Sequence, residues 1–263
     1  MLIDYDQIED WKDSLGAVLS PHVPKSALAV LVAAKPKYVH EACDLILRHG
    51  QRDAIVEAAT RWVEANSAAA YHGTRLTQAE VDSVLATGLR PLKATDRAPR
   101  LTRALSSHPR WGEVAVQLPR VLEALGAGGR MGRREGQVHL TLSRNALVRG
   151  FTHYLAYGSE FDKHAAQMLL GHEGLELLSK DGSPALLKVE MPGSVALAAS
   201  NRYFTPEQMW ARGELPNLVR EVLQAWSFRV AWPEFLPSSL ETDCGIRVDA
   251  VVPADWIVGV ESI

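Results

Sequence analysis

The chain has 263 residues, of which 47% are apolar and 22% charged, a balance typical of globular proteins rather than of disordered, fibrous or disulfide-rich ones. Its 28 Lys and Arg against 31 Asp and Glu give a net charge of −3, which excludes a whole-chain field drawing it onto nucleic acid or an anionic membrane. Two cysteines, Cys43 and Cys244, are too few for a disulfide framework, and no group of Cys and His has zinc spacing, so no metal is expected. The longest apolar run, residues 27–34, is too short to cross a bilayer. We therefore expect a cytoplasmic protein without membrane spans.

The first 66 residues have the pattern of a helical region. Apolar residues recur at three- and four-residue spacing in 26–34, 38–49 and 52–65, and Gly and Pro residues separate these segments. An alanine-rich stretch, residues 66–70, then separates this region from a part with strand and turn signals. These patterns predict a helical N-terminal region over 1–66 and a second domain over 67–263.

The second domain mixes helices and strands. Residues 77–87 are typical of a helix, because Thr77 and Glu80 match a capping box and Gly88 follows as a C-cap. Strand patterns cover 138–142, 186–191, 245–252 and 256–260, and a helix pattern covers 144–157. Because strands dominate the C-terminal two thirds in this interpretation, the expected fold class is α+β.

The segment 90–136 differs from the rest of the chain in its charge. It has ten Lys and Arg against four Asp and Glu, so it carries +6 while the remainder carries −9. We expect a basic insert over 92–136 that faces an anionic partner such as RNA or DNA, with Arg130, Arg133 and Arg134 as the contacts. The alternative is a solvated loop and helix that binds nothing.

The motif Tyr71-His72-Gly73-Thr74 is the most informative about chemistry. A histidine beside a glycine at a strand end offers a ring nitrogen next to backbone groups that no Cβ obscures. Such a pair is able to hold a planar carboxamide through the backbone and a ribose hydroxyl through the imidazole. The alternative interpretation is an ordinary loop histidine whose hydrogen bonds are satisfied within the protein.

This motif, the helix after it and Gly88-Leu89-Arg90-Pro91 resemble the first motif of ADP-ribosyltransferases of the diphtheria-toxin and PARP-like branch. The later order is also similar, with a strand ending at Ser143, a helix bearing aromatic residues, and the segment 185–193. The resemblance implies that residues 67–263 form an ADP-ribosyltransferase-like split β-sandwich with flanking helices, and that NAD is the substrate.

The resemblance also implies roles for the four residues of the first motif. His72 would bind the ribose, Gly73 would pair with the nicotinamide amide, and Tyr71 and Thr74 would flank them in the NAD site.

A second motif of the family supplies aromatic rings that sandwich the nicotinamide, because flat apolar faces desolvate the bond that breaks. Here His139 or Leu140 replaces the first tyrosine of the family. The spacing from the strand at 138–142 favours Phe151 as the second ring, whereas the residue type of the family favours a tyrosine. On the residue type we assign a catalytic role to Tyr154. The implied NAD contacts in this part of the chain are His139, Ser143, Phe151 and Tyr157. Aromatic residues at this spacing are also what an ordinary core helix shows.

The third motif of the family is a glutamate at the start of a late strand, which stabilises the positive charge that develops as nicotinamide leaves. The expected position falls near Gly245, which has no carboxylate. Glu241 and Asp243 are the nearest acids, and we assign the catalytic role to Glu241. The alternative is that both acids lie in a solvated loop.

RNA 2′-phosphotransferases, which also use NAD, provide a second resemblance. They share the His-Gly-Thr core, a strand like residues 138–141 and an ending like residues 252–257, and Leu47-Arg48-His49 matches another of their motifs superficially. The winged-helix signature that should follow that motif is absent. A third possibility is a non-catalytic module that binds NAD or ADP-ribose.

We therefore expect a mono-ADP-ribosyltransferase that uses NAD and modifies a macromolecular acceptor. Its catalytic residues would be His72, Tyr154 and Glu241. The sequence leaves open whether the acceptor is protein or nucleic acid, and whether the protein is a toxin, a defence effector or a housekeeping enzyme.

Overall fold

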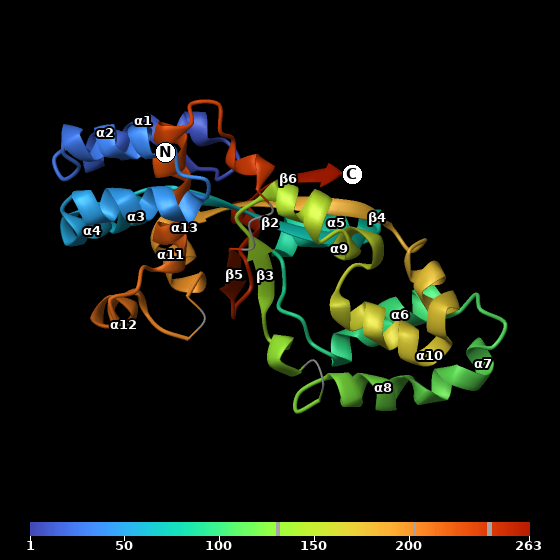
Figure 1. Cartoon of the computed structure of the whole chain (residues 1–263). Helices are drawn as coiled ribbons and strands as arrows, with labels where there is room; N and C mark the ends of the chain where they lie inside the picture. The colour runs from blue at the N-terminus through green and yellow to red at the C-terminus, as the bar shows by residue number, and fades with distance from the viewer. Residues whose placement is uncertain (130–131, 202, 241–243) are drawn as a thin grey trace. The chain divides into compact units, whose positions relative to one another are not determined.

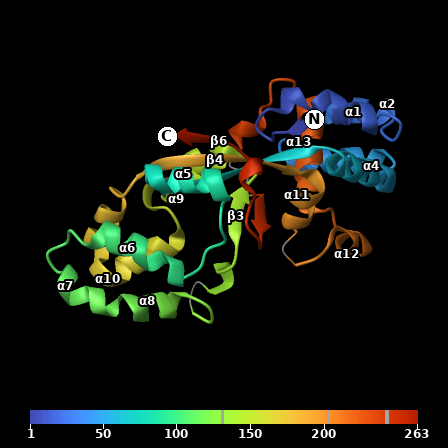
Figure 2. The same ribbon diagram turned by 180° about the vertical axis from the view of Figure 1, so that it is seen from behind.

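A computed structural model describes residues 1–129, 132–201, 203–240 and 244–263, and the chain divides into two compact units (Figures 1 and 2). Unit 1 consists of Met1–Ala70, Thr141–Ala146 and Glu190–Ile246. Unit 2 consists of Tyr71–Leu140, Leu147–Val189 and Arg247–Ile263. Each unit is therefore assembled from segments that are far apart in the sequence.

Unit 1 is mainly helical, and the three helices predicted in the first 66 residues are confirmed. Its elements are β1 (Leu2–Ile3), α1 (Lys12–Leu19), α2 (Lys25–Ala34), α3 (Val39–His49), α4 (Arg52–Glu64), α11 (Gly193–Ala199), α12 (Pro206–Ala211) and α13 (Asn217–Ala231). The late helix α13 packs against α1 to α4, which come from the start of the chain. Trp11, Leu15, Leu31, Ile46 and Ile55 are fully buried in this unit. The apolar stripes of the N-terminal helices therefore form the core that their spacing predicts.

The strands connect through hydrogen bonds into one open six-stranded sheet within the described residues. They are β2 (Ser67–Leu76), β3 (Val138–Thr141), β4 (Ser183–Pro192), β5 (Gly245–Val248) and β6 (Ile257–Ser262), in the order β5-β3-β2-β4-β6. The short β1 pairs in parallel with the start of β2, where Leu2 lies opposite Ser67. β4 and β6 are antiparallel. The expected mixture of helices and strands is thus confirmed.

Unit 2 contains a helical layer that the sequence patterns predicted only in part, since they indicated helices over 77–87 and 144–157 alone. It comprises α5 (Gln78–Thr87), α6 (Ala98–Leu105), α7 (Trp111–Val114), α8 (Leu118–Leu125), α9 (His153–Tyr157) and α10 (Glu160–Leu178). α10 contacts α6, α8 and α9, and its Phe161 and Leu169 share a core with Leu101, Leu105 and Leu125. The basic segment 92–136 is therefore largely helical and contributes to a hydrophobic core.

The alanine-rich stretch 67–70 is the start of β2, with its alanines buried, and the division between the two units follows it, between Ala70 and Tyr71. Two expectations about local structure were wrong. The helix expected over 144–157 is interrupted, because a π-helical turn covers Ala146–Gly150 and α9 begins only at His153. Gly150 has the low helix propensity that suits such a break. Strands do not dominate the C-terminal part, since its longest elements are α10 and α13, of 19 and 15 residues.

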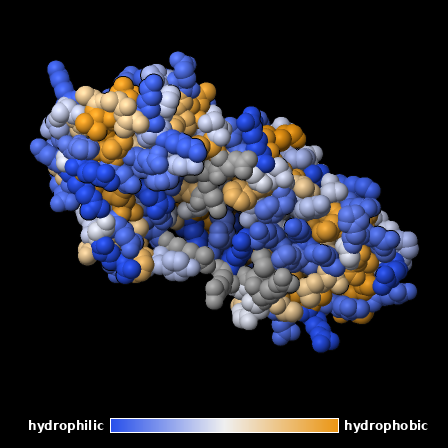
Figure 3. Space-filling view, viewed as in Figure 1, coloured by the Kyte–Doolittle hydropathy of each residue, from blue (hydrophilic) through white to orange (hydrophobic). Residues whose placement is uncertain are grey.

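The surface in Figure 3 is mainly hydrophilic on the face shown. Apolar patches are visible on this face, some of them over the N-terminal helices. Val18, Val30 and Val32 are exposed side chains of α1 and α2. Apolar side chains at the surface are normal in globular proteins and by themselves indicate no ligand.

A buried ion network holds the helices of unit 2 together. Asp162, in the first turn of α10, is fully buried and pairs with Arg97 and Arg100. Arg100, itself only 5% exposed, also contacts both carboxylate oxygens of Glu80 at 3.0 Å. Arg103 joins Glu80 to Asp181, with distances of 3.0 and 2.9 Å. Buried charges are tolerated only when paired in this way, so the network constrains how α5, α6 and α10 pack.

The same network changes the interpretation of the basic insert. Four acids from outside the insert pair with its arginines: Glu80, Glu160, Asp162 and Asp181. A fifth arginine, Arg110, lies 3.7 Å from Glu113 of the insert itself. Much of the positive charge that suggested an anionic partner is therefore neutralised within unit 2.

Gly193 lies directly against the backbone of residues 63–66 in unit 1. Its N–H donates to the Asn66 carbonyl at 2.7 Å, and a Cβ at this position would lie 1.8 Å from the Val63 carbonyl oxygen. We predict that Gly193→Ala lowers the free energy of unfolding by about 2 kcal/mol or more, because a backbone atom must move. The control is Gly245→Ala in the same unit, which would meet nothing within 4 Å. Urea unfolding measures both, and equal stability of the two variants would contradict this packing.

Glu80 provides a pH-dependent prediction. Burial by itself raises its pKa, but the Thr77 backbone N–H and the guanidinium groups of Arg100 and Arg103 outweigh burial and lower the pKa from 4.5 to about 2. A lowered pKa in the folded state stabilises the fold above pH 4.5, and this contribution is lost as the pH falls towards 2. Urea midpoints should therefore fall more steeply over this range in the wild type than in Glu80→Gln.

The control for Glu80 is Glu173→Gln, at an exposed carboxylate of the same unit. This variant should keep the steep wild-type dependence on pH. An unchanged slope in Glu80→Gln would show that the network does not hold Glu80 ionised.

Candidate functional site

His72 lies near the middle of β2 and is hydrogen-bonded to the neighbouring strand β3. Its Nδ1 is 2.8 Å from the carbonyl oxygen of His139. A carbonyl only accepts, so Nδ1 carries the proton and donates. The structure thus brings together two residues, His72 and His139, that the sequence assigned to one site. The contact with His139 is through its main chain, while its side chain is exposed.

The environment of His72 keeps the imidazole neutral. Burial lowers its pKa below the usual 6.5, and the hydrogen bond to the His139 carbonyl opposes this only in part. With the proton on Nδ1, Nε2 of the neutral ring has a lone pair, and no residue in the described ranges hydrogen-bonds to it. His72 therefore offers a hydrogen-bond acceptor or a base, and not a cation.

Gly73 is buried beneath the segment that follows β3. A Cβ at this position would lie 3.2 Å from Cδ2 of Leu147 and 3.5 Å from Cδ2 of Leu155. The structure therefore brings the 147–155 segment, where the sequence placed the stacking aromatic rings, over the first motif. It also fills the space next to Gly73 with leucine side chains. Of the other two motif residues, Tyr71 is buried and Thr74 is half-buried.

Arg75, in β2 next to this motif, forms a hydrogen bond to α9. Its side chain is 9% exposed and donates to the Leu155 carbonyl at 3.2 Å and to the Gly182 carbonyl at 2.6 Å. Arg100 in turn donates to the Arg75 carbonyl at 2.8 Å. The buried ion network and the candidate site are thus connected through one strand residue.

Tyr154 belongs to a polar cluster of four half-buried side chains. Its hydroxyl accepts from Nη1 of Arg134 at 3.3 Å and donates to Glu160 at 3.4 Å. Glu160 also forms an ion pair with Arg134 and accepts from Nε2 of His153 at 3.3 Å. The His153 ring lies 4.1 Å from the Tyr154 ring. Burial raises the pKa of Tyr154, so the phenol is protonated at neutral pH.

The other two aromatic candidates have different surroundings. Phe151 meets the edge of His153 in a T-shaped contact at 6.5 Å. Tyr157 packs against the core around α10 and has Lys163 over its ring at 5.9 Å. Tyr157 is thus an ordinary core aromatic residue, which was the alternative to a role in stacking on nicotinamide. Phe151 and Tyr154 instead both contact the ring of His153.

Ser143 forms hydrogen bonds within a turn of unit 1. Its hydroxyl is fully buried, donates to Asp6 at 2.9 Å and accepts from the Ala146 N–H at 3.2 Å. The other Asp6 oxygen accepts from the backbone of Arg144 at 2.8 Å. Ser143 therefore stabilises the turn that follows β3. Its hydroxyl proton is already donated to Asp6, so the hydroxyl is not able to donate to a ligand.

Several assigned residues lie outside the described part of the chain. Glu241, the alternative acid Asp243, Arg130 and the side chain of Arg133 are among them. Arg134, the third arginine assigned to nucleic acid, is 40% exposed and is paired with Glu160.

Sequence reasoning missed His153 and Glu160. The sequence contains a signal for this region in the pair Gly158-Ser159. In the structure Gly158 has a φ of 79°, and Ser159 caps α10 by accepting from the Asp162 N–H at 3.0 Å. These residues mark a helix start, with acids in its first turn.

Comparison with known proteins assigns no family to the chain: no protein-family model, curated protein or solved structure matches it. The described residues include no group of three or more His, Cys, Asp and Glu side chains able to hold a metal ion. They also include no helix of sufficient length and apolarity to span a membrane.

The tautomer of His72 is directly testable. We predict that ¹⁵N NMR at pH 7 shows its Nδ1 protonated and its Nε2 unprotonated, with a titration midpoint below 6.5, because burial disfavours the charged ring. A midpoint above 6.5, or a proton on Nε2 at pH 7, would contradict this arrangement.

Proposed function

We propose that unit 2 carries an NAD-dependent mono-ADP-ribosyltransferase site, and that the sheet with its flanking helices is a form of the split β-sandwich of that family. The observation that carries the proposal is the geometry of His72. Its Nδ1 donates to β3, so Nε2 is an acceptor on the strand where the family motif requires one. A neutral acceptor suits a ribose hydroxyl, which has a proton to donate.

The residues have distinct roles in this proposal. NAD supplies the ADP-ribosyl group and nicotinamide as the leaving group. His72 accepts a hydrogen bond from the ribose and thereby orients the bond that breaks. Tyr154 offers a ring whose hydroxyl is held by Arg134 and Glu160. Glu241 supplies the carboxylate that stabilises developing positive charge.

The acceptor in this proposal is a macromolecule, either protein or nucleic acid. Because Arg134 is paired with Glu160, a phosphate would have to compete with that carboxylate for the guanidinium. This pairing gives no preference for nucleic acid over protein as acceptor.

A second candidate function is a non-catalytic module that binds NAD or ADP-ribose. Gly245 favours it, because it has no carboxylate at the position where the family has its catalytic glutamate. Leu147 and Leu155 cover the face of Gly73 on which a Cβ would stand. An amide ligand would have to reach Gly73 through its main-chain N–H and C=O and not through that face.

We predict that the wild-type protein releases nicotinamide from NAD and that His72→Ala abolishes this release. The variant loses one hydrogen bond of a half-buried side chain, so its unfolding free energy should fall by only about 1 kcal/mol. Chromatographic assay of nicotinamide measures turnover, and isothermal titration calorimetry measures NAD binding. The control is His172→Ala in the same unit, where the side chain is 80% exposed.

Each outcome of this experiment has a distinct meaning. Turnover in His72→Ala equal to wild type would refute the role of His72. If the wild type binds NAD but releases no nicotinamide, the non-catalytic binding module is the correct function and the transferase is rejected. Release only in the presence of RNA carrying an internal 2′-phosphate would favour the phosphotransferase alternative. No binding and no release would reject NAD altogether.

A further inference from the structure

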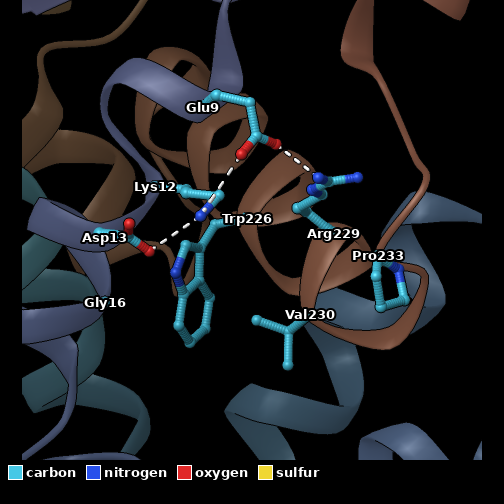
Figure 4. A pocket seen from close by; sticks show the side chains of 8 residues that line it. All are labelled: Glu9, Lys12, Asp13, Gly16, Trp226, Arg229, Val230 and Pro233. Carbon is cyan, nitrogen blue, oxygen red and sulfur yellow. Dashed lines mark hydrogen bonds and ion pairs between the residues drawn. The ribbon is translucent and has the colours of Figure 1, made fainter.

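Unit 1 contains a cleft that plays no part in the proposed ADP-ribosyl transfer. It has a volume of about 450 Å³ and lies between α1 and the end of α13 (Figure 4). Its apolar lining is Gly16, Trp226, Val230 and Pro233, and its polar lining is Glu9, Lys12, Asp13 and Arg229. A volume of this size is within the range of small-molecule sites.

The glycine in α1 creates the apolar wall of the cleft. A Cβ at Gly16 would lie 3.3 Å from the indole nitrogen of Trp226, so the missing side chain leaves room for the ring against the helix. Trp226 is 7% exposed, and no residue in the described ranges accepts a hydrogen bond from its indole N–H. This N–H is therefore a donor that a ligand in the cleft is able to use.

The charged residues of the cleft differ in their exposure. The cations are the more buried, with side-chain exposures of 25% for Lys12 and 19% for Arg229. The carboxylates are the more exposed, at 52% for Glu9 and 88% for Asp13. The two cations are thus less exposed than the two carboxylates with which they pair.

Both cations keep donors that the protein does not use. Arg229 donates through Nη2 to Glu9 at 2.6 Å and through Nη1 to the Phe235 carbonyl at 3.2 Å, which leaves three of its five N–H groups without an acceptor among the described residues. The Lys12 ammonium lies 3.0 Å from Asp13 and 3.5 Å from Glu9, and its third N–H remains. Together with the Trp226 N–H, three residues that line the cleft thus have N–H donors available. Each Glu9 oxygen has one cation and retains a lone pair.

We propose that this cleft binds a free α-amino acid with an apolar side chain. Its carboxylate accepts from Lys12, Arg229 and the Trp226 N–H, and its ammonium group donates to Glu9 and Asp13 nearer the solvent. Its side chain covers Trp226, Val230 and Pro233. The two cations and two carboxylates of the lining pair with one another, and only a zwitterion offers an additional partner of opposite charge to both kinds of group.

The test uses L-phenylalanine as the probe with the full-length protein. Isothermal titration calorimetry should show saturable binding to the wild type. Two analogues that each lack one charge, 3-phenylpropionate and phenethylamine, should both bind at least roughly 10-fold more weakly. This comparison needs no variant, so it does not depend on the folding of a mutant.

Variants then locate the site. Lys12→Gln and Glu9→Gln should each weaken phenylalanine binding by at least roughly 10-fold. The matched control is Lys25→Gln, which removes an equal charge from the exposed start of α2 in the same unit and should change nothing.

The proposal is overturned by any of three results: no saturable binding up to about 10 mM, equal affinity for phenylalanine and either analogue, or equal loss of binding in the Lys25→Gln control. Nicotinamide release is measured separately and has no bearing on this outcome.

Discussion

The buried carboxylate of Asp162 is the constraint on which unit 2 depends. It has no exposed surface and lies against the guanidinium groups of Arg97 and Arg100. A charge in this position is stable only while its partners remain, because loss of either leaves an uncompensated ion in a poorly solvated interior. The pairing therefore ties α10 to α6, and through Glu80 it also ties both helices to α5. The helical layer is held in one arrangement by charge as well as by apolar packing.

This constraint extends to the candidate site. Arg100 donates to the carbonyl of Arg75, and Arg75 donates to the carbonyl of Leu155 in α9. Leu155 lies over Gly73, next to His72. The position of α9, and with it that of Tyr154, thus follows from interactions that begin at a buried ion pair. The basic residues that suggest a surface for nucleic acid on sequence alone act here as internal partners for acids.

Local signals were sufficient for parts of the fold. The capping box at Thr77 and Glu80 starts α5 where it was predicted, and the stripes of α2 to α4 form a buried face. Local signals were not sufficient for residues 67–70. This stretch contains three alanines, a composition that suits a helix as well as a strand. Its strand conformation depends on pairing with β1, which is distant in the sequence. Of the candidate site, the sequence singled out the motif at His72. The carbonyl that fixes its tautomer was not, because His139 is 67 residues away in the chain.

The sequence by itself determined the helical N-terminal segments, the helix after the His-Gly-Thr motif and the mixed fold class, since these depend on periodicity and caps within a few residues. Only the tertiary structure decided which arginines are neutralised, which ring nitrogen of His72 is available, that Ser143 is occupied by Asp6, and that Trp226 meets Gly16 in a cleft. Each of these depends on groups that are distant in sequence and become neighbours when the core forms. Hydrogen bonding and desolvation act on neighbours in space, so no local pattern encodes them.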